Sequence, residues 1–314
     1  MINLDFRPQV HWRAAAIPKK DGTSRYLLIP GDDLKKAQRD ILDELYHNKD
    51  KKIHYCATGF MPFKNTMTGA LRHDRETPLI IQIDLHNFFP SFPVKKLMDV
   101  LRTFLPESKV QYINEFAVFH GRNRDQIPQG APTSPYLTNI GMYDADVAIT
   151  KLAGVFGYYY TRYADDLAFT VRPDADQERA IEQRKSLVAA VASYMEKEYG
   201  IALSWKKTLY AFKNSPRVPR RILGITFRKD GLGYNAPKKL RKKARAMVHN
   251  LWFQLQGGNN PDDLIGDFLA MRGTVNYINR LRRESDLIAA SFDPCVDKEK
   301  FDYIMRRFEC LSIH

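Results

Sequence analysis

The sequence contains few cysteines and no feature typical of a secreted or membrane protein. Its three cysteines, Cys56, Cys295 and Cys310, are scattered without metal-ligand spacing, so neither a disulfide framework nor a zinc site is expected. Residues 1–8 lack a signal-peptide pattern, and no apolar run is long enough to span a bilayer. These absences exclude a disulfide-stabilised secreted domain and predict a cytoplasmic location with no membrane partner.

Internal repeats, low-complexity tracts and long linkers are also lacking, so any lobes must be interleaved along the chain. With 314 residues and 44% hydrophobic side chains, the chain can bury a large core divided into two or three lobes. Acidic residues are in the minority, because 36 Asp and Glu face 49 Lys and Arg, a net charge of +13. This balance suits a polyanion such as nucleic acid, although many basic proteins bind none.

Three aspartates follow or join segments with strand composition. Residues 157–171 predict two aromatic and β-branched strands joined by a tight turn, with Asp165 and Asp166 at its tip. Asp84 ends the apolar stretch at residues 79–83. Mg²⁺ binds through a few carboxylates plus substrate phosphates, and two such ions can hold both oxygens of an in-line displacement. An Asp-Asp pair alone more often marks an exposed turn. A metal site is favoured here because a third aspartate, Asp84, is present and a further motif lies between it and the pair.

That motif is IPQGAPTSP at residues 127–135, which lies between Asp84 and the acidic pair. Together the three segments resemble motifs A, B and C of reverse transcriptases, and those of the retron-type bacterial group most closely. YTRYADDL at residues 160–167 and PQGAP at residues 128–132 match that group almost residue for residue. Several independent motifs therefore occur in the same order, and the resemblance covers residues 17–277.

The resemblance implies an α+β chain with a right-hand polymerase fold of fingers, palm and helical thumb. The expected parts are fingers at residues 1–78 and 96–126, palm at residues 79–95 and 127–233, and thumb at residues 234–314.

The implied activity is that of an RNA-directed DNA polymerase, a nucleotidyltransferase that uses two Mg²⁺ ions, an RNA template and dNTPs to make DNA. The expected catalytic and metal-binding residues are Asp84, Asp165 and Asp166. Of these, Asp84 and Asp165 are expected to ligate the ions directly, with Asp166 nearer the primer. LSWKKT at residues 203–208 resembles motif D, which assigns Lys207 as a catalytic group beside the leaving pyrophosphate.

Further residues are expected to bind the incoming nucleotide. Phe89 occupies the position at which reverse transcriptases place a ring beneath the sugar, where it excludes a 2′-hydroxyl, although any one phenylalanine here is equally suited to the core. Gln129 and Gly130 match the motif B residues that pack against the nucleotide and template base. The family's basic fingers hairpin, which folds over the triphosphate, corresponds to Lys19, Lys20 and Arg25.

The last third of the chain carries the expected nucleic-acid contacts. Gly224 lies in ILGI at residues 222–225, which resembles the primer grip, although a glycine at a strand bulge is a common structural feature. Basic residues surround an apolar stripe in the following helix, and a second basic group comes later. The residues expected to face the duplex are Lys239, Lys242, Lys243 and Arg272. A solvated helix face is the usual alternative for such charges.

The chain departs from retron enzymes in two elements. Retron enzymes carry an Asn-Ala-x-x-His element before motif A, where this chain has GALRH at residues 69–73. They also carry Val-Thr-Gly near motif E, where this chain has ILG at residues 222–224. The defence-associated reverse transcriptases of the unknown groups match equally well. The resemblance thus implies cDNA synthesis on a cognate structured noncoding RNA in antiphage defence, with a possible toxin or effector partner. The alternatives are a catalytically silent RNA-binding scaffold, or an intron-type or template-independent polymerase of the same fold.

Hydrophobic periodicity and turn residues predict the remaining elements. They are a hairpin at residues 13–30, a helix capped by Asp32 or Asp33, helices at 94–104, 109–119, 134–152, 176–199, 237–256 and 261–283, and strands at 201–205 and 221–227.

Overall fold

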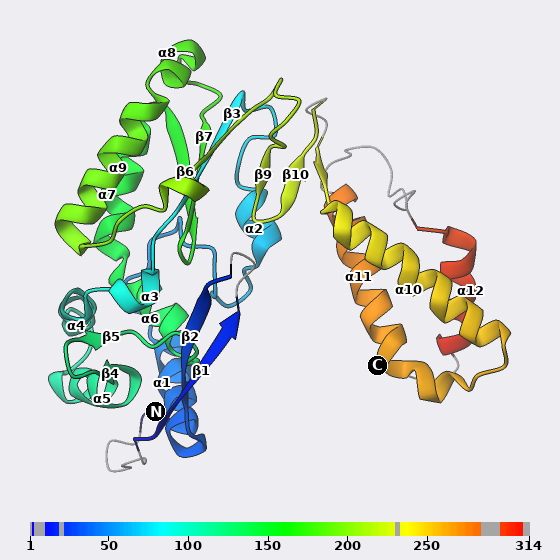
Figure 1. The fold of residues 1–314 in the computed structure, drawn as a ribbon, viewed down its shortest axis with the longest axis horizontal. Helices are drawn as coiled ribbons and strands as arrows, with labels where there is room; N and C mark the ends of the chain where they lie inside the picture. The colour runs from blue at the N-terminus through cyan, green and yellow to red at the C-terminus, as the bar shows by residue number, and fades with distance from the viewer. Residues whose placement is uncertain (1, 3–9, 19–21, 230–232, 284–295, 310–314) are drawn as a thin grey trace. The chain divides into compact units, whose positions relative to one another are not determined.

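The computed structural model describes residue 2 and residues 10–18, 22–229, 233–283 and 296–309. The chain divides into two compact units, unit 1 (Met1–Tyr210) and unit 2 (Ala211–His314). Both units combine helices with short sheets, which confirms the predicted α+β class (Figure 1).

The elements of unit 1 are β1 (Trp12–Pro18), β2 (Ser24–Pro30), α1 (Asp32–His47), α2 (Thr66–Ala70), β3 (Leu79–Asp84), α3 (Phe88–Ser91), α4 (Val94–Arg102), α5 (Glu107–Ala117), β4 (Phe119–His120), β5 (Asp125–Gln126), α6 (Ser134–Gly141), α7 (Tyr143–Val155), β6 (Tyr158–Tyr163), β7 (Asp166–Val171), α8 (Gln177–Glu182), α9 (Arg184–Tyr199) and the 3-10 turn η1 (Trp205–Lys207). Strand β8 (Leu209–Phe212) lies at the boundary. Those of unit 2 are β9 (Arg221–Ile222), β10 (Ile225–Phe227), β11 (Tyr234–Asn235), α10 (Lys238–Gln256), η2 (Pro261–Leu264), α11 (Ile265–Arg283) and α12 (Lys298–Glu309).

The N-terminal hairpin and the helix after it form where the sequence predicts them. Strands β1 and β2 pair antiparallel, with Ile17 opposite Arg25. Helix α1 buries its apolar stripe, but the expected cap is wrong, because the N-cap residue is Gly31 and makes no side-chain cap. Asp32 and Asp33 lie in the first turn instead, where carboxylates complement the helix dipole.

A four-stranded sheet in the order β6-β7-β3-β8 is the centre of unit 1. The first four residues of β3 include three that are fully buried, Leu79, Ile80 and Ile81, as the apolar run requires. Helix α7 packs against β6 and against α9 (Figure 1). Strand β7 pairs antiparallel with both β3 and β6, which fixes the register of the residues at its end.

The helix predicted at residues 134–152 is broken into α6 and α7. The hydroxyl of Tyr199, at the end of α9, accepts from Ala145 N at 3.2 Å and lies 3.3 Å from Gly141 O, to which it donates. The hydroxyl therefore replaces the helical hydrogen bond that Ala145 N would otherwise donate to Gly141 O. A side chain inserted into the backbone hydrogen bonds of a helix bends or breaks that helix. This interruption depends on a residue more than fifty positions away, so local periodicity does not reveal it.

Two further predictions were wrong in detail. The helix expected at residues 176–199 is broken at Gln183 into α8 and α9, where the Arg184 guanidinium donates to Ile181 O at 2.7 Å. The strand expected at residues 201–205 is reduced to an isolated bridge between Leu203 and Leu85. The chain then turns into η1, because Ser204 N donates to Asp84 O at 2.7 Å.

Unit 2 combines a small antiparallel sheet, ordered β11-β10-β9, with three helices. The strand expected at residues 221–227 is a hairpin, since Leu223 and Gly224 both have positive φ, 51° and 83°, as a two-residue primed turn requires. Helices α11 and α12 both pack on α10 (Figure 1). The Phe268 ring of α11 and the Phe308 ring of α12 stack with their centroids 4.1 Å apart. The helices predicted at residues 237–256 and 261–283 are confirmed as α10 and as η2 with α11.

No helix within the described residues is both long enough and apolar enough to cross a bilayer.

Candidate active site

The three aspartates predicted to bind metal meet where β3 ends against the β6–β7 hairpin. Asp84, the last residue of β3, pairs in register with Asp166, the first residue of β7. Asp165 precedes it in the turn, and its carbonyl accepts from Leu85 N at 3.0 Å. Strand pairing thus brings Asp84 to the same sheet end as Asp165 and Asp166, which are distant from it in the sequence.

The turn that carries Asp165 is a tight one with a strained first residue. Tyr163 pairs with Asp166, so the loop consists of Ala164 and Asp165 alone. Ala164 has a φ of 54°, a left-handed conformation that costs a non-glycine residue about 1 kcal/mol. Its carbonyl accepts from the Arg162 guanidinium at 3.2 Å, which offsets this strain and fixes the turn.

Arg162 is the centre of a buried network that sequence reasoning missed. Its guanidinium forms a two-pronged pair with the Asp146 carboxylate, at 2.8 and 2.7 Å, and also donates to Asn139 Oδ1 at 3.0 Å. The Tyr160 hydroxyl donates to the same carboxylate at 3.0 Å. Burial alone lowers the pKa of Arg162, but Asp146 outweighs it and raises that pKa. The available signal was an arginine within a strand of otherwise core-type residues, which requires a buried partner.

The acids at the turn hold their protons more tightly than isolated carboxyls. Burial is the main cause that raises the pKa of Asp165, and Asp84 adds to it. Burial, Asp165 and Asp84 together raise the pKa of Asp166 to about 6. Desolvation and neighbouring negative charge both disfavour a carboxylate, so the cluster favours an added cation.

Lys207 is the cationic side chain that faces these acids. Its ammonium donates to both carboxylate oxygens of Asp84, at 2.9 Å each. The hydrogen bond to Asp84 is the main cause that raises the pKa of Lys207. The Lys207 side chain is 66% exposed and Asp84 is 15% exposed, so the pair opens to solvent on the lysine's side.

As it stands, no group of three or more His, Cys, Asp or Glu side chains among the described residues is arranged to hold a metal ion. The donor chemistry nevertheless fits a hard divalent cation, because the three acids offer only oxygen ligands and two have raised pKa values. The Lys207 ammonium bridges both oxygens of Asp84, which shows that this carboxylate accepts a cation.

The phenylalanines after Asp84 differ in exposure. Phe88 and Phe92 are core residues, each 2% exposed, whereas Phe89 is half-buried. The Phe88 and Phe89 rings pack edge to face at 5.3 Å. Phe89 is thus the member of the trio that is partly open to solvent, as a residue beneath a sugar would have to be.

Motif B is held by strand β2. Leu28 N donates to Gln129 O at 2.8 Å. Gly130 has a φ of 119°, and a Cβ added there would lie 3.1 Å from Leu28 O, so only glycine fits without displacement. The pKa of Asp165 is raised mainly by burial, and Arg25 on the same strand partly offsets that rise. Lys19 and Lys20, from the predicted triphosphate-binding set, lie outside the described residues.

The remaining predicted site residues belong to unit 2. Gly224 is the second residue of the β9–β10 turn, and a Cβ there would meet only Pro237 at an ordinary 3.6 Å. Lys239, Lys242 and Lys243 lie on the exposed side of α10, opposite a buried apolar stripe. Arg272 on α11 is half-buried over the Phe268 ring, 5.6 Å from its centroid.

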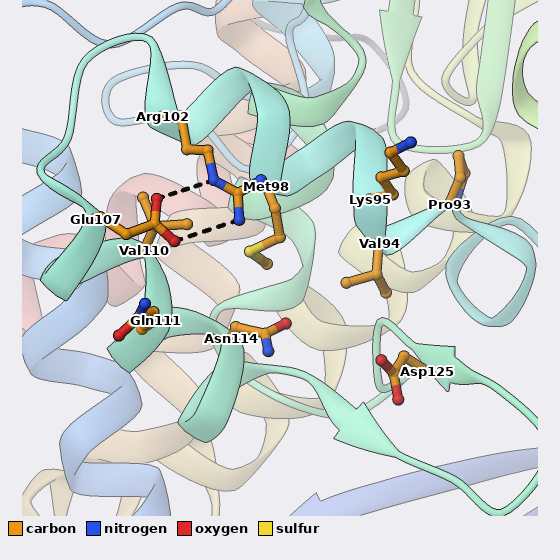
Figure 2. A pocket seen from close by; sticks show the side chains of 10 residues that line it. All are labelled: Pro93, Val94, Lys95, Met98, Arg102, Glu107, Val110, Gln111, Asn114 and Asp125. Atoms are coloured by element: carbon orange, nitrogen blue, oxygen red, sulfur yellow. Dashed lines mark hydrogen bonds and ion pairs between the residues drawn. The ribbon is translucent and has the colours of Figure 1, made fainter.

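A separate hollow of about 520 Å³ lies among α4, α5 and β5 (Figure 2). Arg102 and Glu107 form an ion pair at one side of it, with Nε and Oε2 2.9 Å apart. None of its lining residues belongs to the predicted site, and its charged groups are largely exposed. It offers no chemistry to the aspartate cluster.

Comparison with known families gives a match over most of unit 1. The model of the family described as reverse transcriptase (RNA-dependent DNA polymerase) matches residues 17–227, more than half of the chain. The retron Mx162 reverse transcriptase of Myxococcus xanthus is 30% identical over 261 residues, which are 76% of this chain and 52% of that protein. The retron Ec86 reverse transcriptase of Escherichia coli is 27% identical over 256 residues, 80% of this chain and 72% of that protein. The chain spans about half the length of the Myxococcus relatives it matches.

Solved structures show the same fold at low identity. Telomerase from Candida albicans, in complex with a fragment of telomeric RNA, superposes with a TM-score of 0.53 at 10% identity, covering 99% of this chain and 63% of that one. Apo telomerase from Candida tropicalis gives a TM-score of 0.53 at 11% identity, over 94% of this chain and 58% of that one.

Proposed function

We propose that this chain, which belongs to the reverse transcriptase family, is an RNA-directed DNA polymerase that extends a primer with dNTPs on an RNA template. The observation that carries the proposal is the meeting of Asp84, Asp165 and Asp166 at one sheet end. The right-hand polymerase fold predicted from the sequence is confirmed by the family match and the fold of its structural relatives.

Reverse transcriptases generally use divalent metal ions, and we assign two Mg²⁺ ions to this site. Asp84 and Asp165 would hold them directly, with Asp166 nearer the primer. When bound, such ions hold the attacking and leaving oxygens and neutralise the charge on the transferring phosphate. The raised pKa values of Asp165 and Asp166 support this assignment, because a cation stabilises the ionised carboxylates.

The chain's own side chains position the nucleotide. The half-buried Phe89 ring would lie beneath the sugar and exclude a 2′-hydroxyl, so that dNTPs are favoured over rNTPs. Gln129 and Gly130 would pack against the nucleotide and template base, on a loop held by Leu28. Arg25 would grip the triphosphate together with Lys19 and Lys20 of the hairpin, since guanidinium binds phosphate through two parallel donors.

Lys207 would hold a proton beside the leaving pyrophosphate. Its raised pKa keeps the ammonium charged at neutral pH, where it can donate a hydrogen bond to a phosphate oxygen. Its pairing with Asp84 places this charge at the aspartate cluster.

The primer-template duplex would be held by unit 2. Gly224 would allow a close approach to the primer backbone, and Lys239, Lys242, Lys243 and Arg272 would contact phosphates without reading sequence. The specific template we propose is a cognate structured noncoding RNA, copied in the cytoplasm in antiphage defence with a toxin or effector protein as partner. The similarity to retron enzymes supports this role.

Primer extension tests the function. Wild-type protein should extend a DNA primer on an RNA template with dNTPs and Mg²⁺, whereas Asp84→Asn and Asp165→Asn should abolish synthesis but keep template-primer affinity. Each substitution removes a metal ligand and leaves the basic surface intact. Asp174→Asn, at an exposed acid outside the cluster, is the matched control and should extend like wild type. Extension by both cluster variants would contradict the assignment.

A further inference from the structure

A second hollow in unit 1 lies beside the aspartate turn and motif B. It has a volume of about 370 Å³, within the range of small-ligand sites. Its lining is largely aromatic and proline and comes from three segments: Tyr46 on α1, the loop with Phe60 and Pro62, and motif B with Pro132 and Tyr136. The site proposed above uses none of these side chains.

The loop that forms one wall is anchored to the strand of the catalytic turn. Thr58 N donates to Arg162 O at 2.8 Å, and Asn139 Nδ2 donates to Gly59 O at 2.7 Å. The Phe60 ring packs 5.4 Å from the Tyr163 ring, two residues before Asp165. The hollow is thus fixed relative to the aspartate cluster.

This loop exposes aromatic rings in an unfavourable backbone conformation. Phe60 and Phe63 have φ values of 55° and 61°, in the left-handed region that bulky residues rarely adopt. Phe60 is 47% exposed, and the Phe63 side chain is fully open to solvent. Strain of this kind gathers at sites that bind ligands, and an exposed ring offers a stacking face.

One residue that lines the hollow, Tyr136, carries a polar atom without a partner among the described residues. Tyr136 is 1% exposed, and its hydroxyl is buried with no hydrogen-bond partner among the described residues. A buried hydroxyl left unpaired is costly, and such groups require an explanation. A flat ligand with apolar faces and a polar edge would supply both the stacking surface and the missing hydrogen bond.

We propose that this hollow holds one unpaired base of the RNA template, stacked on Phe60 and hydrogen-bonded at its edge to the Tyr136 hydroxyl. The inference rests on the proposed polymerase function, which brings a template strand to motif B. Unpaired RNA bases are recognised by stacking on aromatic rings and by bonds to their edges. An extruded base would fix the register of the template where it enters the site.

Abasic scanning of the template tests this assignment. Each duplex consists of a DNA primer and an RNA template whose 5′ segment is unpaired. A single abasic site is placed at each unpaired template position in turn, and the affinity of the protein for each duplex is measured by fluorescence anisotropy. For wild-type protein, one position should lower affinity about tenfold, within the range for one base-aromatic stack. On the intact template, Phe60→Leu should show a similar loss, and the abasic site should add nothing further in this variant. Phe253→Leu, at an exposed phenylalanine of unit 2, is the control that should keep the wild-type profile.

Tyr136→Phe separates binding from folding. It removes only an unpaired hydroxyl, so its thermal midpoint should equal or exceed that of wild type, while affinity for the intact template falls by roughly threefold to tenfold. A flat abasic scan, or losses from Phe60→Leu and the abasic site that add, would overturn the proposal. Primer extension by wild-type protein is measured in parallel. No extension at all contradicts the polymerase function, whereas extension with a flat scan contradicts only the base-binding hollow.

Discussion

At the scale of single residues, the aspartate turn depends on a buried ion pair below it. Arg162 and Asp146 are both fully buried, and the guanidinium also holds the carbonyl of the strained Ala164. Removal of one member of such a pair leaves the other charge buried and uncompensated, which is strongly destabilising. The same change would release the turn that carries Asp165.

We expect Asp146→Asn to lower the free energy of unfolding by about 3–5 kcal/mol, measured by chemical denaturation. The exposed pair Arg172–Asp174 provides the matched comparison, and Asp174→Asn should change the free energy of unfolding little, because exposed ion pairs contribute little to stability. Equal losses in the two variants would show that burial of the Arg162 pair contributes nothing to stability.

His73 gives a second prediction at this scale. It is the histidine of the element that departs from the retron pattern, and its ring bridges the hydroxyls of Thr161 on β6 and Thr170 on β7, at 2.6 and 2.8 Å. Burial, with a smaller contribution from Arg72, lowers its pKa from 6.5 to about 3. The His73 ring therefore links β6 to β7 through hydrogen bonds and is shielded from solvent.

The unfolded chain protonates His73 near pH 6.5 and the folded chain only near pH 3. The stability that His73 contributes is therefore complete above pH 6.5 and is lost as the pH falls toward 3, by about 1.4 kcal/mol per pH unit at most. Unfolding free energies measured from pH 7 to pH 4 should show this slope in wild type and a reduced slope in His73→Gln. The exposed His47→Gln should keep the wild-type slope, and an unchanged slope in His73→Gln would contradict the assignment.

At the scale of elements, the sequence predicts what local pattern determines. The β1–β2 hairpin, β3 ending at Asp84 and the β6–β7 hairpin follow from composition and turn residues, and they suffice to gather the aspartates. Two predictions failed where distant groups intervene: the Tyr199 hydroxyl breaks a helix, and Asp84 O accepts from Ser204 N where a strand was expected. The Arg162–Asp146 pair was not predicted, for the same reason. No periodicity within a short window contains such contacts.

Tyr199→Phe tests the cause of the α6–α7 break. The substitution leaves Ala145 N and Gly141 O without the hydroxyl between them, so thermal stability should fall by about 1–3 kcal/mol, the cost of unsatisfied buried groups. Tyr194→Phe, at a half-buried tyrosine of the same helix, should change stability less. Wild-type stability in Tyr199→Phe would mean that the helix breaks for another reason.

At the scale of the whole molecule, the net charge of +13 is unevenly distributed, and a dense group of basic residues lies at residues 238–245. Helix α10 presents exposed lysines opposite a buried stripe, and acids are absent from its first turn. A charged face of this kind binds phosphates independently of base sequence and makes affinity depend on salt.

We expect the triple substitution of Lys239, Lys242 and Lys243 by Gln to weaken template-primer binding equally for all sequences. The slope of log affinity against log salt should fall by about one unit per lost phosphate contact, about three in all. The control replaces Lys151, Lys185 and Lys197, exposed lysines on α7 and α9 that give the same change in net charge. Identical slopes in the two triple variants would assign the effect to net charge alone.

The backbone hydrogen bond from Leu28 N to Gln129 O ties the β1–β2 hairpin to the motif B loop. A side chain at position 130 would press on Leu28 O, so the backbones of motif B and β2 lie close together at this point. Under the proposed function, a hairpin that closes on a triphosphate would carry the motif B loop with it, so nucleotide binding and contact with the template base would be thermodynamically linked. Linkage is reciprocal: a correct base pair would tighten nucleotide binding by the same free energy by which the nucleotide tightens the pair. Copying errors should then respond to substitutions in β2 that never touch a base.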